Sequence, residues 1–179
     1  MTTTGEQRLS AVAPFRSNAV GAITRQQNPV NIEFPFEALD TFTTPNAQFY
    51  VRSHFPFPAI DAKTWRLDIA GLVDHPIPLT LDRLKAMPRE EVTFTLECSG
   101  NNGLPFFQSG VGNARWGGTS LAQVLKAAQL KDDALEVVFF GADTGEEVVR
   151  PSTPLEYKFT TTFARSMSVA DAMSPVNML

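Results

Sequence analysis

The chain has 179 residues, of which 43% are apolar and 19% charged, and its fifteen basic and nineteen acidic residues give a formal charge of −4. This composition is typical of a folded chain with one core and excludes an intrinsically disordered one. The acidic balance offers no strong field to a polyanion, so nucleic acid is not an expected partner. No run approaches the roughly 20 consecutive apolar residues of a membrane helix. No signal peptide is visible either, so we expect no membrane partner and, by default, a cytoplasmic location.

Residues 1–45 are expected to form an N-terminal arm, and residues 46–179 the folded domain. Up to about residue 28, the arm is rich in Thr, Ser, Gln and Ala without a sustained period, which indicates loose order. Proline and phenylalanine are frequent from Pro29 to Pro58, which favours extended chain over helix. Within this stretch, residues 48–52 have the aromatic and β-branched content of a short strand.

The middle of the chain predicts two further strands. Residues 65–70 alternate apolar and polar side chains, as a strand with one buried face does. Residues 79–84 predict a strand end that runs into a short helix, which Pro88 stops. Residues 92–96 alternate again, so Cys98 is expected directly beyond a strand end, where functional residues are often placed.

The clearest predicted helix begins at a cap on Thr119 or Ser120 and ends near Ala128, with apolar side chains at helical spacing. The elements expected after it are a buried strand at 135–140, a turn at 141–143, a return strand at 147–150 and a short helix at 169–173.

Arg52 and His54 lie two positions apart on an expected strand, so their side chains are expected on the same face. A guanidinium can bind a phosphate or an oxyanion through two hydrogen bonds, and an imidazole can add another. The pair is therefore a candidate anion site. The alternative is a surface ion pair beside a core histidine.

Cys98 is the only cysteine, which excludes an intrachain disulfide. The small residues after it, 99–101, allow a bulky group to approach the sulfur. A thiolate favours soft or sulfur-rich metal centres, and one cysteine ligand requires the remaining coordination to come from a cofactor or solvent. A structural cysteine is the alternative. A zinc site with His54 and His75 lacks zinc-like spacing, and a Cys–His hydrolase lacks a helix that would activate the thiol.

Residues 112–118 combine three glycines with Arg115 and Trp116 directly before the predicted helix. Backbone N–H groups, the helix N-terminus and the guanidinium of Arg115 are expected to gather there, which makes Arg115 a candidate ligand-binding residue. The segment matches neither a phosphate loop nor a dinucleotide motif. The alternative is a tight loop with Trp116 in the core.

Five segments, in their order and spacing, resemble the sulfite oxidase family of molybdopterin-dependent oxidoreductases. They are FYVRSH at 49–54, WRL at 65–67 leading to Gly71, LTL at 79–81, TLECSGN at 95–101 and ARWGG at 114–118. The resemblance covers about residue 46 to the end. It implies a mixed, β-rich α+β fold that binds a molybdenum–molybdopterin cofactor. In this family the metal is held by a pterin dithiolene, oxo groups and one protein cysteine.

The resemblance also implies roles for individual residues. Cys98 matches the metal ligand, and Arg52 is expected near the substrate side of the metal, so both are expected to be catalytic. Asp143 resembles the carboxylate that hydrogen-bonds the pterin ring, and residues 50–54 match the stretch that lines the pterin and its phosphate. The full set of expected cofactor-binding residues is Tyr50, Arg52, Ser53, His54, Cys98, Arg115 and Asp143.

The family transfers an oxygen atom between molybdenum and substrate, and the electrons then leave to a haem or cytochrome. Expected partners are therefore a small anionic or oxo-acceptor substrate and a cytochrome or other electron acceptor, whereas the oligomeric state is not predicted. Sulfite oxidases carry an arginine soon after the cysteine. At this place the chain has the sequence NNGL (residues 101–104) and a shortened loop to Gly110. This difference leaves open whether sulfite is the substrate.

The second half of the family's domain is not found before Leu179, and the sequence is expected to be truncated. The chain alone is then expected to be inactive unless a second polypeptide completes it, because the cofactor phosphate loses several charged hydrogen bonds. One alternative is a non-catalytic remnant that binds an anion or a partner through its uncovered surface. Another is an unrelated β-rich binding module in which Cys98 is inert.

Overall fold

The computed structural model describes residues 21–99 and 110–179, in which strands predominate. Its strands are β1 (Ile23–Gln27), β2 (Val30–Glu33), β3 (Val51–Arg52), β4 (Arg66–Ile69), β5 (Ile77–Thr80), β6 (Glu90–Glu97), β7 (Val111–Gly118), β8 (Glu136–Val149) and β9 (Tyr157–Ser168). Its α-helices are α1 (Leu81–Lys85), α2 (Leu121–Ala127) and α3 (Val169–Ala172), and short 3-10 turns lie at Phe36–Ala38 and Asn46–Gln48. The expected β-rich α+β class is confirmed.

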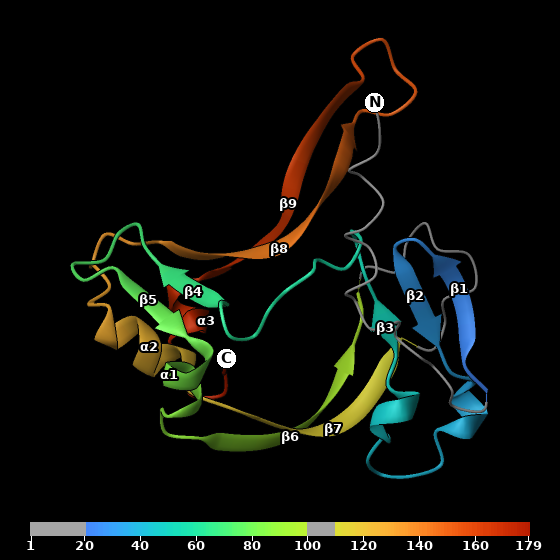
Figure 1. The fold of residues 1–179 in the computed structure, drawn as a ribbon, viewed down its shortest axis with the longest axis horizontal. Helices are drawn as coiled ribbons and strands as arrows, with labels where there is room; N and C mark the ends of the chain where they lie inside the picture. The colour runs from blue at the N-terminus through green and yellow to red at the C-terminus, as the bar shows by residue number, and fades with distance from the viewer. Residues whose placement is uncertain (1–20, 100–109) are drawn as a thin grey trace, which may run out of the picture.

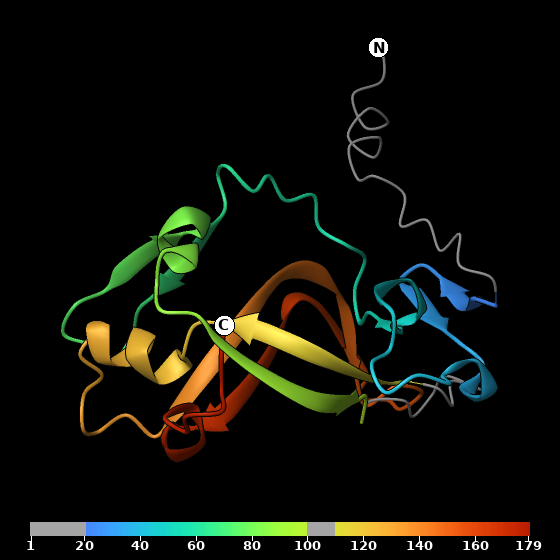
Figure 2. The ribbon, with the colours of Figure 1, turned by 90° about the horizontal axis from the view of Figure 1, so that it is seen from below.

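The strands pair as one three-stranded antiparallel sheet, β1-β2-β3, and three two-stranded antiparallel ones, β4-β5, β6-β7 and β8-β9. In Figure 1, the β6-β7 and β8-β9 ribbons both start near the group formed by β4, β5 and the helices, and β6-β7 ends beside β3. Figure 2 shows the two ribbons running in the same general direction when the molecule is seen from below. The β6-β7 ribbon thus leads from the helical end of the molecule to β3, whereas the far end of the β8-β9 ribbon extends away from the β1-β2-β3 sheet (Figure 1).

Helix α2 forms the best-buried part of the structure. Ser120 is its N-cap and Ala128 its C-cap, and its buried side chains recur at helical spacing, as predicted. Leu121 and Leu125 form a buried cluster with Ala172 of α3. The partly buried side chains packed against this cluster are Val137, Phe139, Met167, Met173 and Leu179. The base of the β8-β9 ribbon is therefore anchored on the helices.

Several other predicted elements are also confirmed. Strand β4 covers the predicted alternating segment, and β5 leads directly into α1, whose first turn is capped when the Thr80 hydroxyl accepts a hydrogen bond from the Arg83 N–H at 3.1 Å. Helix α3 follows β9 where the last short helix was expected. Local sequence signals were sufficient for these elements because each carries its own cap or periodicity.

Residues 112–118 lie in strand β7, so the alternative of a tight loop before α2 is wrong. The backbone of β7 pairs with β6 along its whole length, with Trp116 opposite Val92. The glycines mark places where other groups approach closely: a Cβ on Gly112 would lie 2.6 Å from the Phe49 ring. A glycine within a strand can mark such a close approach, and the sequence alone does not distinguish it from a glycine in a loop.

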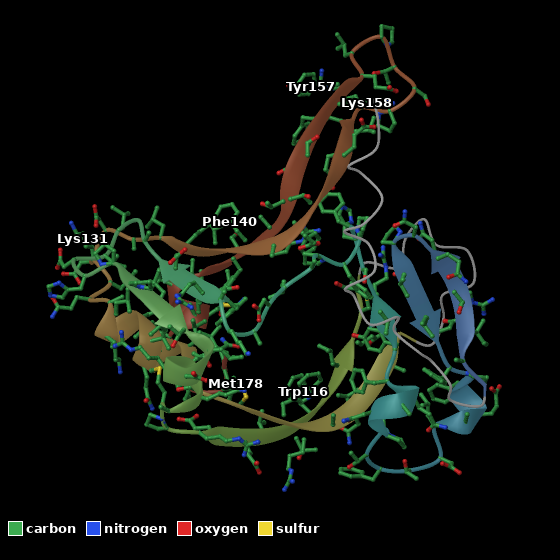
Figure 3. All side chains as sticks on the ribbon, in the orientation of Figure 1. Trp116, Lys131, Phe140, Tyr157, Lys158 and Met178 are labelled. Atoms are coloured by element: carbon green, nitrogen blue, oxygen red, sulfur yellow. The ribbon has the colours of Figure 1, made fainter. Side chains whose placement is uncertain are left out.

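The turn expected at residues 141–143 is also wrong, because β8 continues through this segment as one strand. Its register with β9 shifts between Phe140 and Thr144, which is the mark of a bulge. The return strand is β9, not residues 147–150. The first part of β8 is not a buried strand either, since Leu135 before it is 81% exposed and Phe140 within it 73% (Figure 3).

The N-terminal part of the described chain is more ordered than expected. Residues 23–27 form β1 instead of loose chain, and β2 pairs with β3, which lies beyond the predicted domain boundary at residue 46. The boundary stays a prediction, and the first 20 residues of the expected arm lie outside the described residues. Among the helices that the structure describes, none is long and apolar enough to cross a membrane.

Leu125→Ala tests the anchoring role of α2. Leu125 is 4% exposed, so we expect the free energy of unfolding to fall by about 2–5 kcal/mol, the usual cost of such a truncation in a core. Urea unfolding followed by circular dichroism measures it. Lys126→Ala, on the exposed side of the same turn, is the control and should change stability by less than about 0.5 kcal/mol. Equal effects of the two changes would contradict the packing described.

Candidate functional site

One cavity of about 640 Å³ brings together segments that are far apart in the sequence. Its volume lies within the range of small-molecule and cofactor sites. It is lined by Tyr50, Arg52, Ser53, His54, Phe55, Phe57 and Pro58 around β3, by Glu97, Cys98 and Ser99 at the end of β6, and by Asp143, Phe163 and Arg165 of the β8-β9 ribbon. Every expected cofactor-binding residue except Arg115 lines this cavity.

Arg115 does not line the cavity. Its side chain is 72% exposed and forms a cross-strand ion pair with Glu91 at 3.5 Å. Because neighbouring residues of a strand project to opposite faces, Trp116 lies on the other side of β7, the side that faces β8-β9 (Figure 3). A hydrogen bond from Arg89 and the charge of Arg115 lower the pKa of Glu91. Residues 112–118 therefore do not line the cavity, and ligand binding by Arg115 stays a prediction.

Asn31 of β2 fixes the segment that carries Arg52. Its side chain is fully buried, and its Oδ1 accepts hydrogen bonds from the Ser53 N–H at 2.8 Å and from Arg52 Nη1 at 3.3 Å. Its Nδ2 donates to Gln26 Oε1 at 2.9 Å and to the Pro29 carbonyl at 3.2 Å. Sequence reasoning missed Asn31 because a single asparagine in an irregular polar stretch carries no periodic or motif signal.

An aromatic stack positions Tyr50. The centroid of the Phe49 ring lies 5.4 Å from that of the Tyr50 ring. Phe49 also contacts Trp116 edge-on, with 5.6 Å between the ring centroids and 88° between the ring planes. The close approach of Phe49 to β7 leaves no room for a side chain at Gly112. The phenol of Tyr50 is thus held at the cavity by packing that begins on β7.

The electrostatics of Tyr50 show how close it lies to the acidic groups of the cavity. Burial raises the pKa of its phenol most, and the charges of Cys98 and Glu97 raise it further. The phenol therefore remains protonated at neutral pH and presents a hydroxyl that can donate a hydrogen bond.

Cys98 follows β6 directly, as predicted. Its N–H donates to the Gly110 carbonyl at 2.8 Å, which continues the β6-β7 hydrogen-bond pattern past the end of the strand. Among residues 21–99 and 110–179, no group of three or more His, Cys, Asp or Glu side chains could hold a metal ion. The residues expected to depart from sulfite oxidases, 101–104, lie outside the described part of the chain.

The wall opposite Cys98 contains residues that sequence reasoning missed. The His54 ring lies between Phe55 and Phe163, at 4.5 and 5.2 Å between ring centroids, and its Nε2 pairs with the carboxylate of Glu147. The guanidinium of Arg165 lies 4.3 Å from the centre of the Phe163 ring, a cation–π contact. Because a turn was expected at residues 141–143 and the return strand at 147–150, β9 was not predicted. Phe163 and Arg165 both lie on β9.

Glu97→Gln tests the electrostatic environment of Tyr50. Tyr157→Phe first leaves Tyr50 as the only tyrosine, so that ultraviolet absorbance reports its ionisation alone. We expect Glu97→Gln to lower the pKa of Tyr50, because one of the charges that raise it is removed. Glu136→Gln, distant in sequence and outside the cavity lining, is the control. An unchanged titration curve in Glu97→Gln would contradict the proximity of the two side chains.

The raised pKa of Tyr50 also affects the stability of the folded chain at alkaline pH. Because the pKa of Tyr50 is raised in the folded state, the folded chain binds more protons than the unfolded chain above about pH 10, and its stability falls there as pH rises. Tyr50→Phe should remove this part of the alkaline loss.

Comparison with known proteins agrees with this geometry. A family model described as the oxidoreductase molybdopterin binding domain matches residues 54–179. Mitochondrial sulfite oxidase of Drosophila melanogaster is 37% identical over an alignment of 130 residues that covers 65% of this chain and 22% of that protein. Nitrate reductase (NADH) 1 of Oryza sativa subsp. japonica is 36% identical over an alignment of 134 residues that covers 65% of this chain and 15% of that protein.

A solved structure shares the fold. The crystal structure of the sulfane dehydrogenase SoxCD from Paracoccus pantotrophus superposes with a TM-score of 0.67 and 21% identity, covering 96% of this chain and 45% of that one. The chain thus spans less than a quarter of the two curated relatives and less than half of the structural neighbour. The family match over residues 54–179 shows that the chain belongs to the oxidoreductases with a molybdopterin-binding domain, of the sulfite oxidase type.

Proposed function

We propose that the cavity around Cys98 binds a molybdenum–molybdopterin cofactor and that the chain is part of a sulfite oxidase-like oxidoreductase. The observation that carries the proposal is the donor set: a soft thiol, two guanidiniums, an imidazole and three hydroxyl side chains line one cavity of cofactor size. These groups fit a ligand that combines a thiophilic metal with an anionic, hydrogen-bonding organic part.

Each residue has a role that its chemistry supports. The thiolate of Cys98 would bind the metal, and the guanidinium of Arg52 would donate hydrogen bonds to an oxyanion of the cofactor or the substrate. The carboxylate of Asp143 would accept hydrogen bonds from ring N–H groups of the pterin. The Tyr50 phenol would donate one from its protonated form. When bound, the cofactor supplies oxygen-atom transfer coupled to a two-electron change at the metal.

The substrate is proposed as a small anion or oxo-acceptor, with a cytochrome or another one-electron acceptor as redox partner. The relatives are named for sulfite, nitrate and sulfane chemistry, so the family accommodates several small oxo or sulfur substrates. The positive groups at the cavity, Arg52 and Arg165, favour an anion, whereas Glu97 and Asp143 limit the net charge it can carry. That the chain alone is inactive stays a prediction.

Cys98→Ser tests the proposed metal ligand. After expression in cells that make molybdopterin, we expect about one molybdenum per wild-type chain and at least a tenfold lower content in Cys98→Ser, because a hydroxyl is a poor ligand for a soft metal. Elemental analysis of the purified chain measures it. Ser166→Ala, outside the cavity lining, is the control and should bind molybdenum as the wild type does. Equal molybdenum content in Cys98→Ser would contradict the assignment.

Arg165→Gln tests the anion-binding side of the cavity. Within the described part of the chain, Arg165 forms no ion pair, and its Nη1 donates a hydrogen bond to the neighbouring Ala164 carbonyl at 2.7 Å. We expect the affinity for inorganic sulfate, measured by calorimetry, to fall about 3- to 10-fold, since an exposed charged hydrogen bond is lost. Arg83→Gln, on α1, is the control. An unchanged sulfate affinity would remove Arg165 from the site.

A further inference from the structure

The β8-β9 ribbon holds one of the cavity's side chains through a carboxylate. His54 Nε2 pairs with Oε1 of Glu147, and each side chain keeps 38% of its surface exposed. The two residues are 93 positions apart, so the contact depends on the fold and not on neighbouring chain. No motif or expected site residue included Glu147.

Ring packing and a glycine support the same arrangement. Phe55 and Phe163 lie against the His54 imidazole, at 4.5 and 5.2 Å between centroids. A Cβ on Gly145 would lie 2.1 Å from Phe55 Cδ1, so the ring of Phe55 occupies the space that a side chain there would need. Gly145 and Glu147 are two positions apart on β8 and share a face. This face therefore seats the segment that carries His54.

The pairing decides which nitrogen of His54 remains for a ligand. An ionised carboxylate can only accept hydrogen bonds, so Nε2 must carry the proton that it donates to Glu147. Nδ1 is then the nitrogen left to contact a group in the cavity. It accepts a hydrogen bond when the ring is neutral and donates one when the ring is charged.

We propose that Glu147 is a positioning residue of this cavity, which holds His54 in the Nε2–H tautomer and leaves Nδ1 to bind a polar group of the ligand. The charged groups that face the ring or share its cavity are Glu147, Arg52, Arg165, Asp143 and Glu97, and the titratable side chains of Tyr50 and Cys98 line the same cavity. That the ligand is the cofactor rests on the proposed function, whereas the tautomer of His54 does not. Carboxylate partners of this kind fix the ring orientation of functional histidines in other sites.

The first test uses the full chain without cofactor. Nitrogen-15 NMR of the imidazoles at alkaline pH reports the tautomers of His54 and His75, and His75→Gln assigns the signals. We expect His54 to be the Nε2–H tautomer in the wild type and a mixture in Glu147→Ala. Glu147→Gln should restore it, because the amide oxygen still accepts the hydrogen bond.

Glu146→Ala is the matched control for this test, since Glu146 is exposed on the same strand and pairs with Lys158 at 3.8 Å. It should leave the His54 signals unchanged. The same His54 tautomer in Glu147→Ala and in the wild type would overturn the inference. If the Glu147→Ala chain does not fold, Glu147→Gln provides the test. A changed His54 tautomer in a folded Glu147→Gln chain would also overturn the inference.

The second test measures retention of molybdenum and pterin in the loaded chain during dialysis. We expect Glu147→Ala to lose both on the order of 10-fold faster than the wild type, and Glu147→Gln less than about 3-fold faster. A wild type that binds no molybdenum, with the NMR result as expected, would contradict the proposed function and leave the positioning role intact. Equal retention in Glu147→Ala and wild type would contradict the role of Nδ1 toward the cofactor.

Discussion

The arrangement of the cavity depends on the buried side chain of Asn31, which joins β2 to the segment after β3. Its Oδ1 accepts from both the Ser53 backbone and the Arg52 guanidinium, and its Nδ2 has two acceptors of its own. Loss of a buried amide with this many partners would leave several polar groups without hydrogen bonds, each at a cost of about 1–3 kcal/mol. The N-terminal strands are therefore part of the support of the site and not an appendage.

Two antiparallel ribbons complete the cavity from different directions. The β6-β7 ribbon delivers Cys98 at its end and, through Trp116 and Gly112, the packing that holds Phe49 against Tyr50. The β8-β9 ribbon supplies Asp143 and the wall that contacts His54. Since two-stranded ribbons are weakly stable alone, the anchoring of β8-β9 on α2 and α3 and the contacts of both ribbons at the cavity stabilise each other. A ligand that contacts both ribbons and the segment around β3 would stabilise the same arrangement.

Much of the fold could be predicted where a local signal decides the structure. The alternation in β4, the cap of α1 and the apolar spacing of α2 each act over a few residues, and all three were recognised. The order of the motifs also indicated the family and the residues that meet at the cavity. What could not be predicted depends on long-range pairing: β7 and the bulge in β8 contain glycines that resemble turns until the partner strand is known. Glu147 and Asn31 belong to no motif, so only the folded chain shows their contacts.

The proposed function depends on a bond between the sulfur of Cys98 and molybdenum. X-ray absorption at the molybdenum edge counts the sulfur ligands of the metal directly. We expect one more sulfur ligand in the loaded wild-type chain than in the Cys98→Ser chain loaded in the same way, because the pterin sulfurs are common to both. The same number of sulfur ligands in both samples would rule out Cys98 as the metal ligand.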